Sequence, residues 1–453
     1  MSGLARVLLQ MGYRVSGSDL SATHITEELK KLGAEIFYSH KKENLPEGAD
    51  AVVASSAIPD HNPEIAEARR RGLDIMARGH LLSLLMNPQK GVAIAGTHGK
   101  TTTSAMVSHI LKCAAFDPTF IVGGVLKAIG TNAKLGGSDY LVAEADESDA
   151  SFVELHPFAA VVTSIDGDVN LSSGAFNDCH NDYAEVLTKI RRLFLQFING
   201  VKPDGFAVLC GDHEGVRAVL PEVKSRFCTY GLSEHNDVRA VGIEYADYKS
   251  SFTVVKDGAE LGRVQLPMPG SHNVQNALAA IAISLGLGIP FASAADALGA
   301  FSGVGRRFDV VSRSKDIIIV DDYAHNPEKI KAALNSAHTG GAKRVIAVFQ
   351  PHRFSRTEFL LDQFPLVFSD ADILLVTDIY SAGEEPIEGV TSEKLVEKIM
   401  NLDSHPERVA YVPDADGIVD FVGKECKAGD LVIFLGAGDI CKCARRCAEM
   451  LRD

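Results

Sequence analysis

The sequence predicts an α/β protein built from three domains. The prediction rests on the length, on apolar strand patterns that alternate with helical patterns, and on a glycine-rich loop between a strand and a helix. The chain has 453 residues, and one domain per roughly 150 residues gives about three domains. We expect boundaries near residues 88 and 305, which divide the chain into 1–88, 89–305 and 306–453.

Composition and charge exclude several function classes. Hydrophobic residues make up 46% of the chain and charged residues 23%, as in ordinary globular proteins, which disfavours disorder, collagen and coiled coil. Lys and Arg total 45 and Asp and Glu total 59, a net charge of −14, so we expect no nucleic-acid partner and no anionic membrane surface as partner. We see no membrane-length apolar segment and no signal peptide, and the 8 scattered cysteines fit a reducing cytoplasm.

The first 88 residues alternate between helical and strand patterns. We expect helices within 4–11 and 26–32, and strands within 13–19 and 49–54, followed by a linker at 87–89. Such alternation is typical of a Rossmann-like parallel sheet with binding loops at the strand ends. The last domain repeats the pattern, with strands expected at 316–320, 344–349, 373–377 and 431–435.

The strongest local signal is a shortened phosphate-binding loop. A buried strand at 92–95 is followed by Gly96-Thr97-His98-Gly99-Lys100-Thr101-Thr102 and then by a helix to about residue 113. Glycines let successive backbone N–H groups point at phosphate oxygens, and the lysine supplies a positive charge for the β- and γ-phosphates. The Thr101 hydroxyl can bind Mg²⁺. An ordinary glycine-rich turn is the alternative interpretation.

A second group that could bind the metal follows a neighbouring strand. The strand at 140–143 leads directly into Glu144-Ala145-Asp146-Glu147, and carboxylate oxygens suit Mg²⁺. Glu144 is the preferred metal ligand, and the alternative is a solvated acidic turn. Further strands are expected at 159–163 and 205–209, and the alternating pattern of 237–266 predicts antiparallel strands added to this ATP-binding domain.

Taken together, the motifs resemble the Mur ligase family of ATP-dependent amide-bond ligases, over almost the whole chain. Within that family the segments 349–357 and 378–384 are similar to those of the alanine-adding type. The matching segments are Gly96–Thr102, Glu144–Phe152, Gly270–Ala277, Gly305–Phe308, Asp321–His325, Phe349–Thr357, Asp378–Glu384 and Gly436–Ile440.

The resemblance implies an activity and a set of ligands. The implied reaction joins L-alanine to the lactyl carboxylate of UDP-N-acetylmuramate through an acyl phosphate, releases ADP and phosphate, and serves peptidoglycan synthesis. ATP and Mg²⁺ are the implied cofactors. The first domain would bind the UDP substrate, and the last would bind the amino acid and close over the reacting groups to exclude water.

The resemblance also implies residue roles. The implied catalytic residues are Lys100, His325, Arg353 and Arg356. The implied ATP-binding residues are Gly96, Thr97, His98, Gly99, Lys100, Thr101, Thr102, His272, Asn276, Arg307 and Asp322. Substrate binding falls to Asp19, Ser55, Ser56 and Tyr323, and metal binding to Thr101, Glu144 and His180. For His272 a helix N-terminal cap, and for the two arginines Arg353 and Arg356 a solvated turn, are alternative interpretations.

Two departures from the family pattern stand out. Relatives begin with a strand and a glycine-rich loop, and this sequence starts inside that motif at Met1-Ser2-Gly3, so we expect a mis-assigned start or a truncation of the first domain. Relatives also carry a metal-binding histidine where this chain has Val169. We expect an inserted stretch to bring His180 into that role, with a surface-loop position as the alternative.

Other readings stay open. A related ligase could use another amine or another nucleotide-sugar, because glycine, L-serine and L-alanine differ by one small group. A degenerate homologue that binds ligand without turnover is the third possibility. We expect a monomer or weak homodimer, and the cysteines at 441, 443 and 447 do not predict a metal site.

Overall fold

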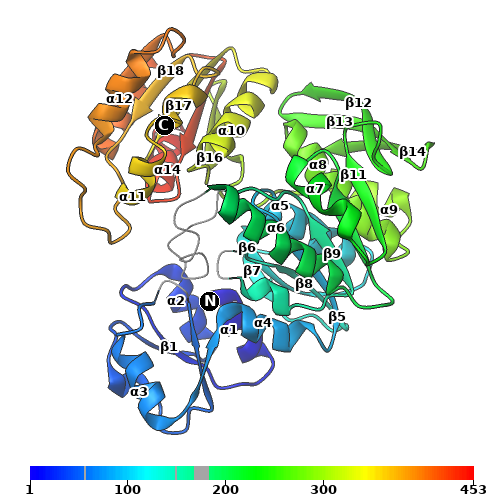
Figure 1. The fold of residues 1–453 in the computed structure, drawn as a ribbon. Helices are drawn as coiled ribbons and strands as arrows, with labels where there is room; N and C mark the ends of the chain where they lie inside the picture. The colour runs from blue at the N-terminus through cyan, green and yellow to red at the C-terminus, as the bar shows by residue number, and fades with distance from the viewer. Residues whose placement is uncertain (56–57, 148–149, 168–182, 453) are drawn as a thin grey trace. The chain divides into compact units, whose positions relative to one another are not determined.

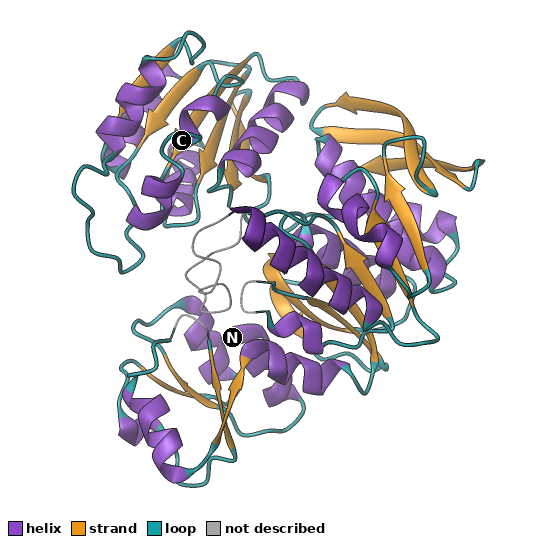
Figure 2. Cartoon of the chain, viewed as in Figure 1, coloured by secondary structure: helices purple, strands orange, loops and turns teal. Residues whose placement is uncertain are grey.

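The computed structural model describes residues 1–55, 58–147, 150–167 and 183–452, and it confirms the predicted α/β class (Figures 1 and 2). The chain divides into two compact units. The first unit holds residues 1–241, 253–264 and 275–301, and the second holds 242–252, 265–274 and 302–453. Among the described residues, no helix combines the length and the apolar character needed to cross a membrane.

The N-terminal part of the first unit contains two separate pairs of short parallel strands. Strand β1 pairs with β2, and β3 pairs with β4. The predicted strands at 13–19 and 49–54 are shorter in the structure, where they cover only β1 and β3. The elements are α1 (Ser2–Gln10), β1 (Ser16–Ser18), α2 (His24–Lys31), β2 (Glu35–Phe37), η1 (Lys42–Asn44), β3 (Ala51–Ala54), α3 (Pro63–Arg71), β4 (Asp74–Ala77) and α4 (Arg78–Met86).

The middle of the chain forms a ten-stranded sheet, in the order β14-β13-β12-β11-β10-β9-β5-β8-β6-β7. Strand β5 lies in the middle and pairs in parallel with both β8 and β9. Its elements up to the hairpins are β5 (Lys90–Ala95), α5 (Lys100–Cys113), β6 (Thr119–Leu126), β7 (Thr131–Lys134), β8 (Tyr140–Glu144), η2 (Ser151–Glu154), β9 (Ala159–Val162), α6 (Tyr183–Asn199), β10 (Phe206–Cys210), α7 (Glu214–Val219), η4 (Leu220–Glu222) and β11 (Phe227–Gly231).

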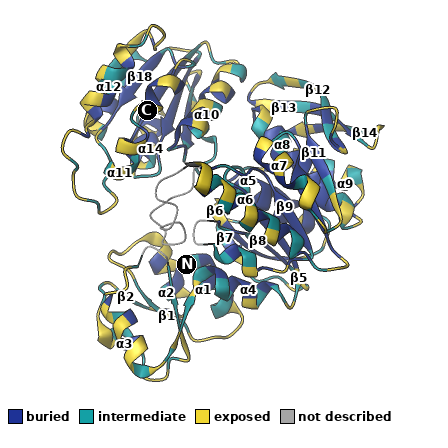
Figure 3. Cartoon of the chain, in the orientation of Figure 1, coloured by how far each residue is buried: buried dark blue, intermediate teal, exposed yellow. Residues whose placement is uncertain are grey.

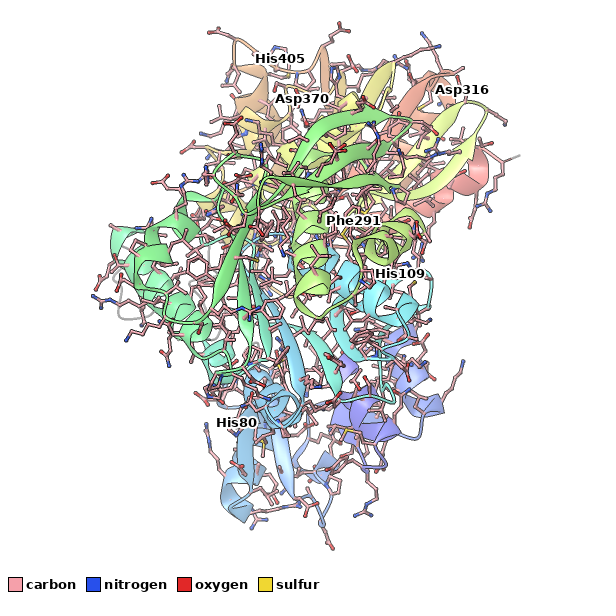
Figure 4. The ribbon with its side chains drawn as sticks, turned by 90° about the vertical axis from the view of Figure 1, so that its right-hand side faces the viewer. His80, His109, Phe291, Asp316, Asp370 and His405 are labelled. Carbon is pink, nitrogen blue, oxygen red and sulfur yellow. The ribbon has the colours of Figure 1, made fainter. Side chains whose placement is uncertain are left out.

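The continuous apolar runs of this sheet follow from its burial. Residues 92–95 of β5 and 159–162 of β9 have no exposed surface, as expected for parallel strands covered on both faces (Figure 3). On the covering helices, His109 of α5 packs its ring 5.5 Å from that of Phe301; His109 is labelled in Figure 4. Because parallel strands share one direction, the loops after β5, β8 and β9 emerge at the same edge of the sheet.

The predicted antiparallel strands at 237–266 are present as β12 (Val238–Ala246), β13 (Lys249–Lys256) and β14 (Ala259–Leu266). The strands are neighbours in the sheet, and only two residues separate each from the next, which parallel strands do not allow. Helices α8 (Ser271–Gly286) and α9 (Phe291–Gly299) follow.

The C-terminal part has its own six-stranded sheet, in the order β15-β16-β20-β17-β18-β19. Five of these strands are parallel, and β15 adds an antiparallel edge that the sequence did not indicate. The elements are β15 (Asp309–Ser314), β16 (Ile317–Asp322), α10 (Pro327–Thr339), β17 (Arg344–Phe349), α11 (Phe354–Phe359), η5 (Phe364–Val367), β18 (Ile373–Val376), α12 (Ser392–Met400), β19 (Arg408–Tyr411), α13 (Ala415–Glu425), β20 (Asp430–Leu435) and α14 (Ile440–Met450).

Local signals explain where several of these helices begin. The side chain of Asn326 accepts a hydrogen bond from the backbone N–H of Lys329 at 3.1 Å, and Pro327 occupies the first helical position of α10. Thr391 and Asp414 cap α12 and α13 in the same way. A polar cap therefore stands at the end of a strand-to-helix loop, where the carboxyl ends of the parallel strands also place binding residues.

Candidate active site

The phosphate-binding loop leaves β5 and enters α5 in a conformation that needs glycine. Gly96 and Gly99 have φ values of 132° and 78°, in the region that favours glycine. A Cβ at Gly96 would lie 2.0 Å from the Thr163 hydroxyl, and one at Gly99 would lie 2.5 Å from the Asn276 Oδ1. The helix then begins at Lys100, so its first backbone N–H groups point toward the loop.

The segment after β9 holds this loop through hydrogen bonds. The His98 backbone N–H donates to the Ser164 hydroxyl at 3.0 Å, and the Asp166 N–H donates to the Thr97 hydroxyl at 3.1 Å. Thr163 donates its hydroxyl proton to the His98 carbonyl oxygen. The loop is thus fixed from outside by neighbouring backbone and hydroxyl groups.

Asp166 lies between two histidines. Its Oδ1 is 3.2 Å from the Nε2 of His213, and its Oδ2 is 3.5 Å from the Nε2 of His98. Because the Nδ1 of His213 accepts the Gly215 N–H at 3.2 Å, its proton sits on Nε2 and faces Asp166. Burial alone would raise the pKa of Asp166, but the hydrogen bond from His213 and the charges of His213 and His98 together outweigh it and keep that pKa below its ordinary value.

Lys100 is bound on all sides by oxygen atoms. Its ammonium donates to both carboxylate oxygens of Glu147, at 2.8 and 2.9 Å, and to the Gly96 carbonyl oxygen at 2.5 Å. Burial alone would lower the pKa of Lys100, but the carboxylates of Glu147, Asp146 and Glu144 outweigh it and raise that pKa. Lys100 is therefore a fixed positive charge within the loop.

The two predicted metal ligands that the structure describes lie together. The Thr101 hydroxyl donates to Oε2 of Glu144 at 3.2 Å, and the backbone N–H of Gly123 donates to Oε1. A Cβ at position 123 would lie 2.9 Å from both Glu144 oxygens and 3.1 Å from the Thr101 hydroxyl, so glycine keeps the space before these oxygens open. Hard oxygen ligands around an open space fit Mg²⁺. The third predicted ligand, His180, lies outside the described residues.

A pocket of about 300 Å³ opens beside Glu144 in the first unit. Arg78 at the start of α4 lies on its wall, with Nη2 3.8 Å from the Asp146 carboxylate. The pocket is lined by Met1, Ser2, Gly3, Leu4, Arg78, Ile121, Val122, Gly123, Asn132, Glu144 and Asp146. The Arg78 guanidinium on this wall can bind an anionic substrate group, whereas Glu144 and Asp146 would repel one unless a metal ion offsets their charge.

Asn276, one of the predicted ATP-binding residues, contacts the first turns of α5. Its Oδ1 accepts the Thr103 hydroxyl at 3.1 Å, one turn into α5. The neighbouring Gln275 donates to the Asp212 carboxylate at 2.9 Å. His272 belongs to the second unit, where burial lowers its pKa to about 4. The ATP-binding role of His272 stays a prediction.

In the second unit, the end of β16 gathers charged and aromatic groups. The Asp322 carboxylate accepts the backbone N–H of Phe308 at 2.6 Å and that of Ala324 at 2.8 Å. The guanidinium of Arg307 lies 5.1 Å from the centre of the Tyr323 ring, within cation–π range. Three predicted residues, Arg307, Asp322 and Tyr323, therefore meet here.

His325 and His352 lie next to these groups, with ring centres 6.0 Å apart. The Nδ1 of His325 is 2.7 Å from the Tyr323 carbonyl oxygen and so carries the proton, and burial with nearby Lys329 holds its pKa well below the ordinary value. The Nδ1 of His352 accepts from Arg356 at 3.1 Å, and burial followed by the charge of Arg356 lowers its pKa to about 4. Both rings are neutral at physiological pH: the acceptor nitrogen of His325 is its Nε2, whereas that of His352 is its Nδ1, which already accepts from Arg356.

Arg353 and Arg356 flank the start of α11. Arg353 has a φ of 69°, an uncommon value for a residue with a side chain, and its backbone N–H donates to the Tyr380 carbonyl oxygen at 2.8 Å. The Arg353 guanidinium lies 3.9 Å from the Glu384 carboxylate. The structure thus brings both predicted arginines and His325 into one cluster, in which Tyr380 stacks on His352 at 5.6 Å.

Of the predicted substrate-binding residues in the first domain, the structure describes Asp19 and Ser55. Asp19 accepts the Ser21 N–H at 3.3 Å, and the Ser55 carbonyl oxygen accepts the Ile58 N–H at 2.9 Å, while Ser56 lies outside the described residues. Next to Asp19, the Ser18 hydroxyl donates to Glu64 at 2.7 Å and lies 3.0 Å from the Nδ1 of His40.

Sequence reasoning assigned no role to several residues of these clusters. They are Glu147, Asp166, His213, Arg306 and His352. Glu147, Arg306 and His352 had a signal, because each stands within a segment that resembles the family: Glu144–Phe152, Gly305–Phe308 and Phe349–Thr357. Their roles were missed because their contacts join residues far apart in the chain, such as Arg306 with the Gly436 carbonyl oxygen at 2.7 Å.

Family models account for most of the chain. The Mur ligase family catalytic domain matches residues 1–90, the Mur ligase middle domain matches 94–284, and the Mur ligase glutamate ligase domain matches 306–438. The α/β architecture and the phosphate-binding loop agree with these matches. The chain therefore belongs to the Mur ligase family.

Individual relatives are similar over nearly their full length. The UDP-N-acetylmuramate–L-alanine ligase of Geotalea uraniireducens is 48% identical over 453 residues, covering 100% of this chain and 96% of the relative. That of Syntrophotalea carbinolica is 48% identical over 454 residues, with the same coverage. Among solved structures, the UDP-N-acetylmuramate–alanine ligase of Thermotoga maritima has a TM-score of 0.82 and 28% identity, covering 100% of this chain and 96% of that one.

Proposed function

We propose that this chain catalyses the ATP-dependent joining of L-alanine to the lactyl carboxylate of UDP-N-acetylmuramate, as a step of peptidoglycan synthesis. The observation that carries the proposal is the 48% identity to UDP-N-acetylmuramate–L-alanine ligases over the whole chain. The retained phosphate loop, with Lys100 and the Thr101–Glu144 pair in place, supports catalysis over a binding-only role.

The first unit would activate the carboxylate. Backbone N–H groups of the loop and the Lys100 ammonium would offset the charge of the ATP phosphates while the γ-phosphoryl group passes to the lactyl oxygen, forming an acyl phosphate and ADP. Thr101 and Glu144 would hold Mg²⁺, which supplies charge neutralisation for the phosphate oxygens when it is bound. The role of His180 as a further ligand stays a prediction.

The second unit would bind and prepare the amine. Arg353 or Arg356 can bind a carboxylate in a two-point fashion. The Nε2 of neutral His325, whose Nδ1 carries the proton, can accept a proton from the ammonium of the amino acid, which frees the nitrogen lone pair for attack on the acyl phosphate. Phosphate then leaves, and the amide remains.

Several expectations also stay predictions. They are the remaining assigned residue roles, the domain boundaries at 88 and 305, the cytoplasmic location and the monomeric or weakly dimeric state.

Release of phosphate from ATP tests the proposal. Phosphate release is expected only when UDP-N-acetylmuramate and the amine are both present, and L-alanine is expected to give a higher kcat/KM than glycine or L-serine. A preference for glycine or L-serine would move the proposal to a related ligase. No release in any mixture, although ADP binds, would favour a non-catalytic homologue.

A further inference from the structure

The bond between Lys100 and Glu147 is a contact that the proposed reaction does not use. The lysine ammonium has three protons, and the two Glu147 oxygens and the Gly96 carbonyl oxygen accept them at 2.8, 2.9 and 2.5 Å. The side chains are 17% and 10% exposed. The lysine that should meet the nucleotide phosphates is thus already fully bonded within the protein.

The surrounding charges make Glu147 a competitor of phosphate. Glu144 and Asp146 also act on Lys100 electrostatically, so three carboxylates surround this one ammonium. Glu144 has partners of its own in the Thr101 hydroxyl and the Gly123 N–H. Glu147, in contrast, places both of its oxygens on Lys100, which is the geometry that two phosphate oxygens would take.

We propose that Glu147 is a positioning residue of the phosphate loop: it holds the Lys100 ammonium in the nucleotide-free protein, and the nucleotide phosphates displace it. The inference rests on the proposed function, because it assumes a nucleotide at this loop. Each bound nucleotide must break two charge-assisted hydrogen bonds and bring its phosphates close to a buried carboxylate. Glu147 therefore weakens nucleotide binding while it keeps the empty loop ordered.

Metal-free binding of ADP, measured by titration calorimetry in the presence of a chelator, tests this role in the full chain. Glu147→Gln removes the charge but keeps the size, so ADP is expected to bind about tenfold more tightly than to the wild type. Glu147→Asp keeps the charge and should retain most of the competition. A merely structural role predicts the opposite, because loss of a buried ion pair would loosen the loop and weaken binding.

The chain offers a matched control at the other end of the same two strands. Lys90 at the start of β5 lies 3.5 Å from Asp139, just before β8, and both side chains are about half exposed. Asp139→Asn removes the carboxylate of this lysine–aspartate ion pair and leaves the phosphate loop unchanged. The ADP affinity of this variant should equal that of the wild type. A gain in the control as large as in Glu147→Gln would overturn the proposal.

The remaining outcomes also decide. Unchanged or weaker metal-free ADP binding by Glu147→Gln overturns the inference. If metal-free binding is unchanged and binding in the presence of Mg²⁺ is weaker, Glu147 is a metal ligand instead. If Glu147→Gln does not fold, Glu147→Ala, which leaves room for water, is measured with the same expectation. No ADP binding by the wild type, with or without Mg²⁺, would overturn the proposed function itself, whereas normal wild-type binding confines the failure to Glu147.

Discussion

At the scale of single residues, His213 makes two different contacts near the phosphate loop. Its Nδ1 caps α7 through the Gly215 N–H, and its Nε2 donates to Asp166, whose own N–H reaches Thr97 of the loop. One ring therefore serves a helix terminus and a carboxylate beside the loop. The two contacts can be removed one at a time.

We expect His213→Ala to lower the free energy of unfolding by about 1–2 kcal/mol, because it removes a helix cap and a partner of a half-buried carboxylate. The KM for ATP should rise several-fold. His213→Asn keeps a capping side chain but is too short to reach Asp166. It should therefore recover most of the stability, measured by urea unfolding, and none of the ATP affinity. Full recovery of both would show that only the cap matters.

The pKa of His272 gives a stability prediction with a definite sign. Burial lowers the pKa of this imidazole from 6.5 to about 4 in the folded protein. Between these values the unfolded chain binds more protons than the folded one, so stability is present above pH 6.5 and is lost as the pH falls toward 4. The upper bound of this loss is about 3 kcal/mol.

Urea unfolding at several values between pH 7 and pH 4 measures this effect. His272→Gln cannot titrate, so its free energy of unfolding should fall less with acidification than that of the wild type. His61→Gln, an exchange at an exposed position, should follow the wild-type curve. Parallel curves for His272→Gln and wild type would contradict the prediction.

At the scale of elements, the turn from β5 to α5 depends on Gly96 more than on other glycines with positive φ. A Cβ there would lie 2.0 Å from the Thr163 hydroxyl and 2.9 Å from the backbone nitrogen of Ser164. Gly130 also has a positive φ, 75°, but a Cβ there would meet nothing within 4 Å. Comparing substitutions at Gly96 and Gly130 therefore distinguishes the cost of steric overlap from the cost of backbone strain.

Gly130→Ala should cost about 1 kcal/mol of unfolding free energy from strain alone. Gly96→Ala should cost at least about 2 kcal/mol more, since backbone must move, and it should abolish measurable ADP binding. Chemical denaturation and calorimetry report the two quantities. Equal losses of stability in both variants would mean that the loop yields easily at Gly96.

The same elements show what the sequence could and could not predict. Strand β17 has the bounds that its apolar run indicates, and β5 and β9 are recognisable because parallel strands buried on both faces are continuously apolar. Strand β15 escaped prediction because an antiparallel edge strand, only partly buried, carries a weaker pattern. The strand at 13–19 was too long, because only Ser16–Ser18 find a partner.

In the candidate site, too, local motifs were predictable from the sequence and long-range contacts were not. The loop and its lysine were predictable, since glycine, lysine and threonine at fixed spacing follow from the needs of a phosphate. The partner of Lys100 was not, because it depends on the path of the chain after β8, which brings Glu147 back to residue 100. Likewise, the Nδ1 of His213 accepts a hydrogen bond from the backbone N–H of Ile165, 48 positions earlier in the chain. No local sequence pattern indicates this contact.

At the scale of the whole molecule, each compact unit has its own hydrophobic core. The core of the first unit includes Ala93, Leu141 and Val162, and one core of the second includes Val320, Phe349 and Ile433. Separate cores allow separate cooperative unfolding. We therefore expect a calorimetric unfolding enthalpy larger than the van't Hoff enthalpy, whereas equality of the two would show one cooperative unit.

Adding nucleotide shows which thermal unfolding transition belongs to which compact unit. Because a ligand stabilises only the state that binds it, ADP at about 100 times its Kd should add about 2.7 kcal/mol to the unit that contains the phosphate loop and raise the temperature of that transition. Lys100→Met should lose the shift and keep both transitions in the absence of nucleotide. An equal shift of both transitions would instead show that ADP draws its stabilisation from groups in both units.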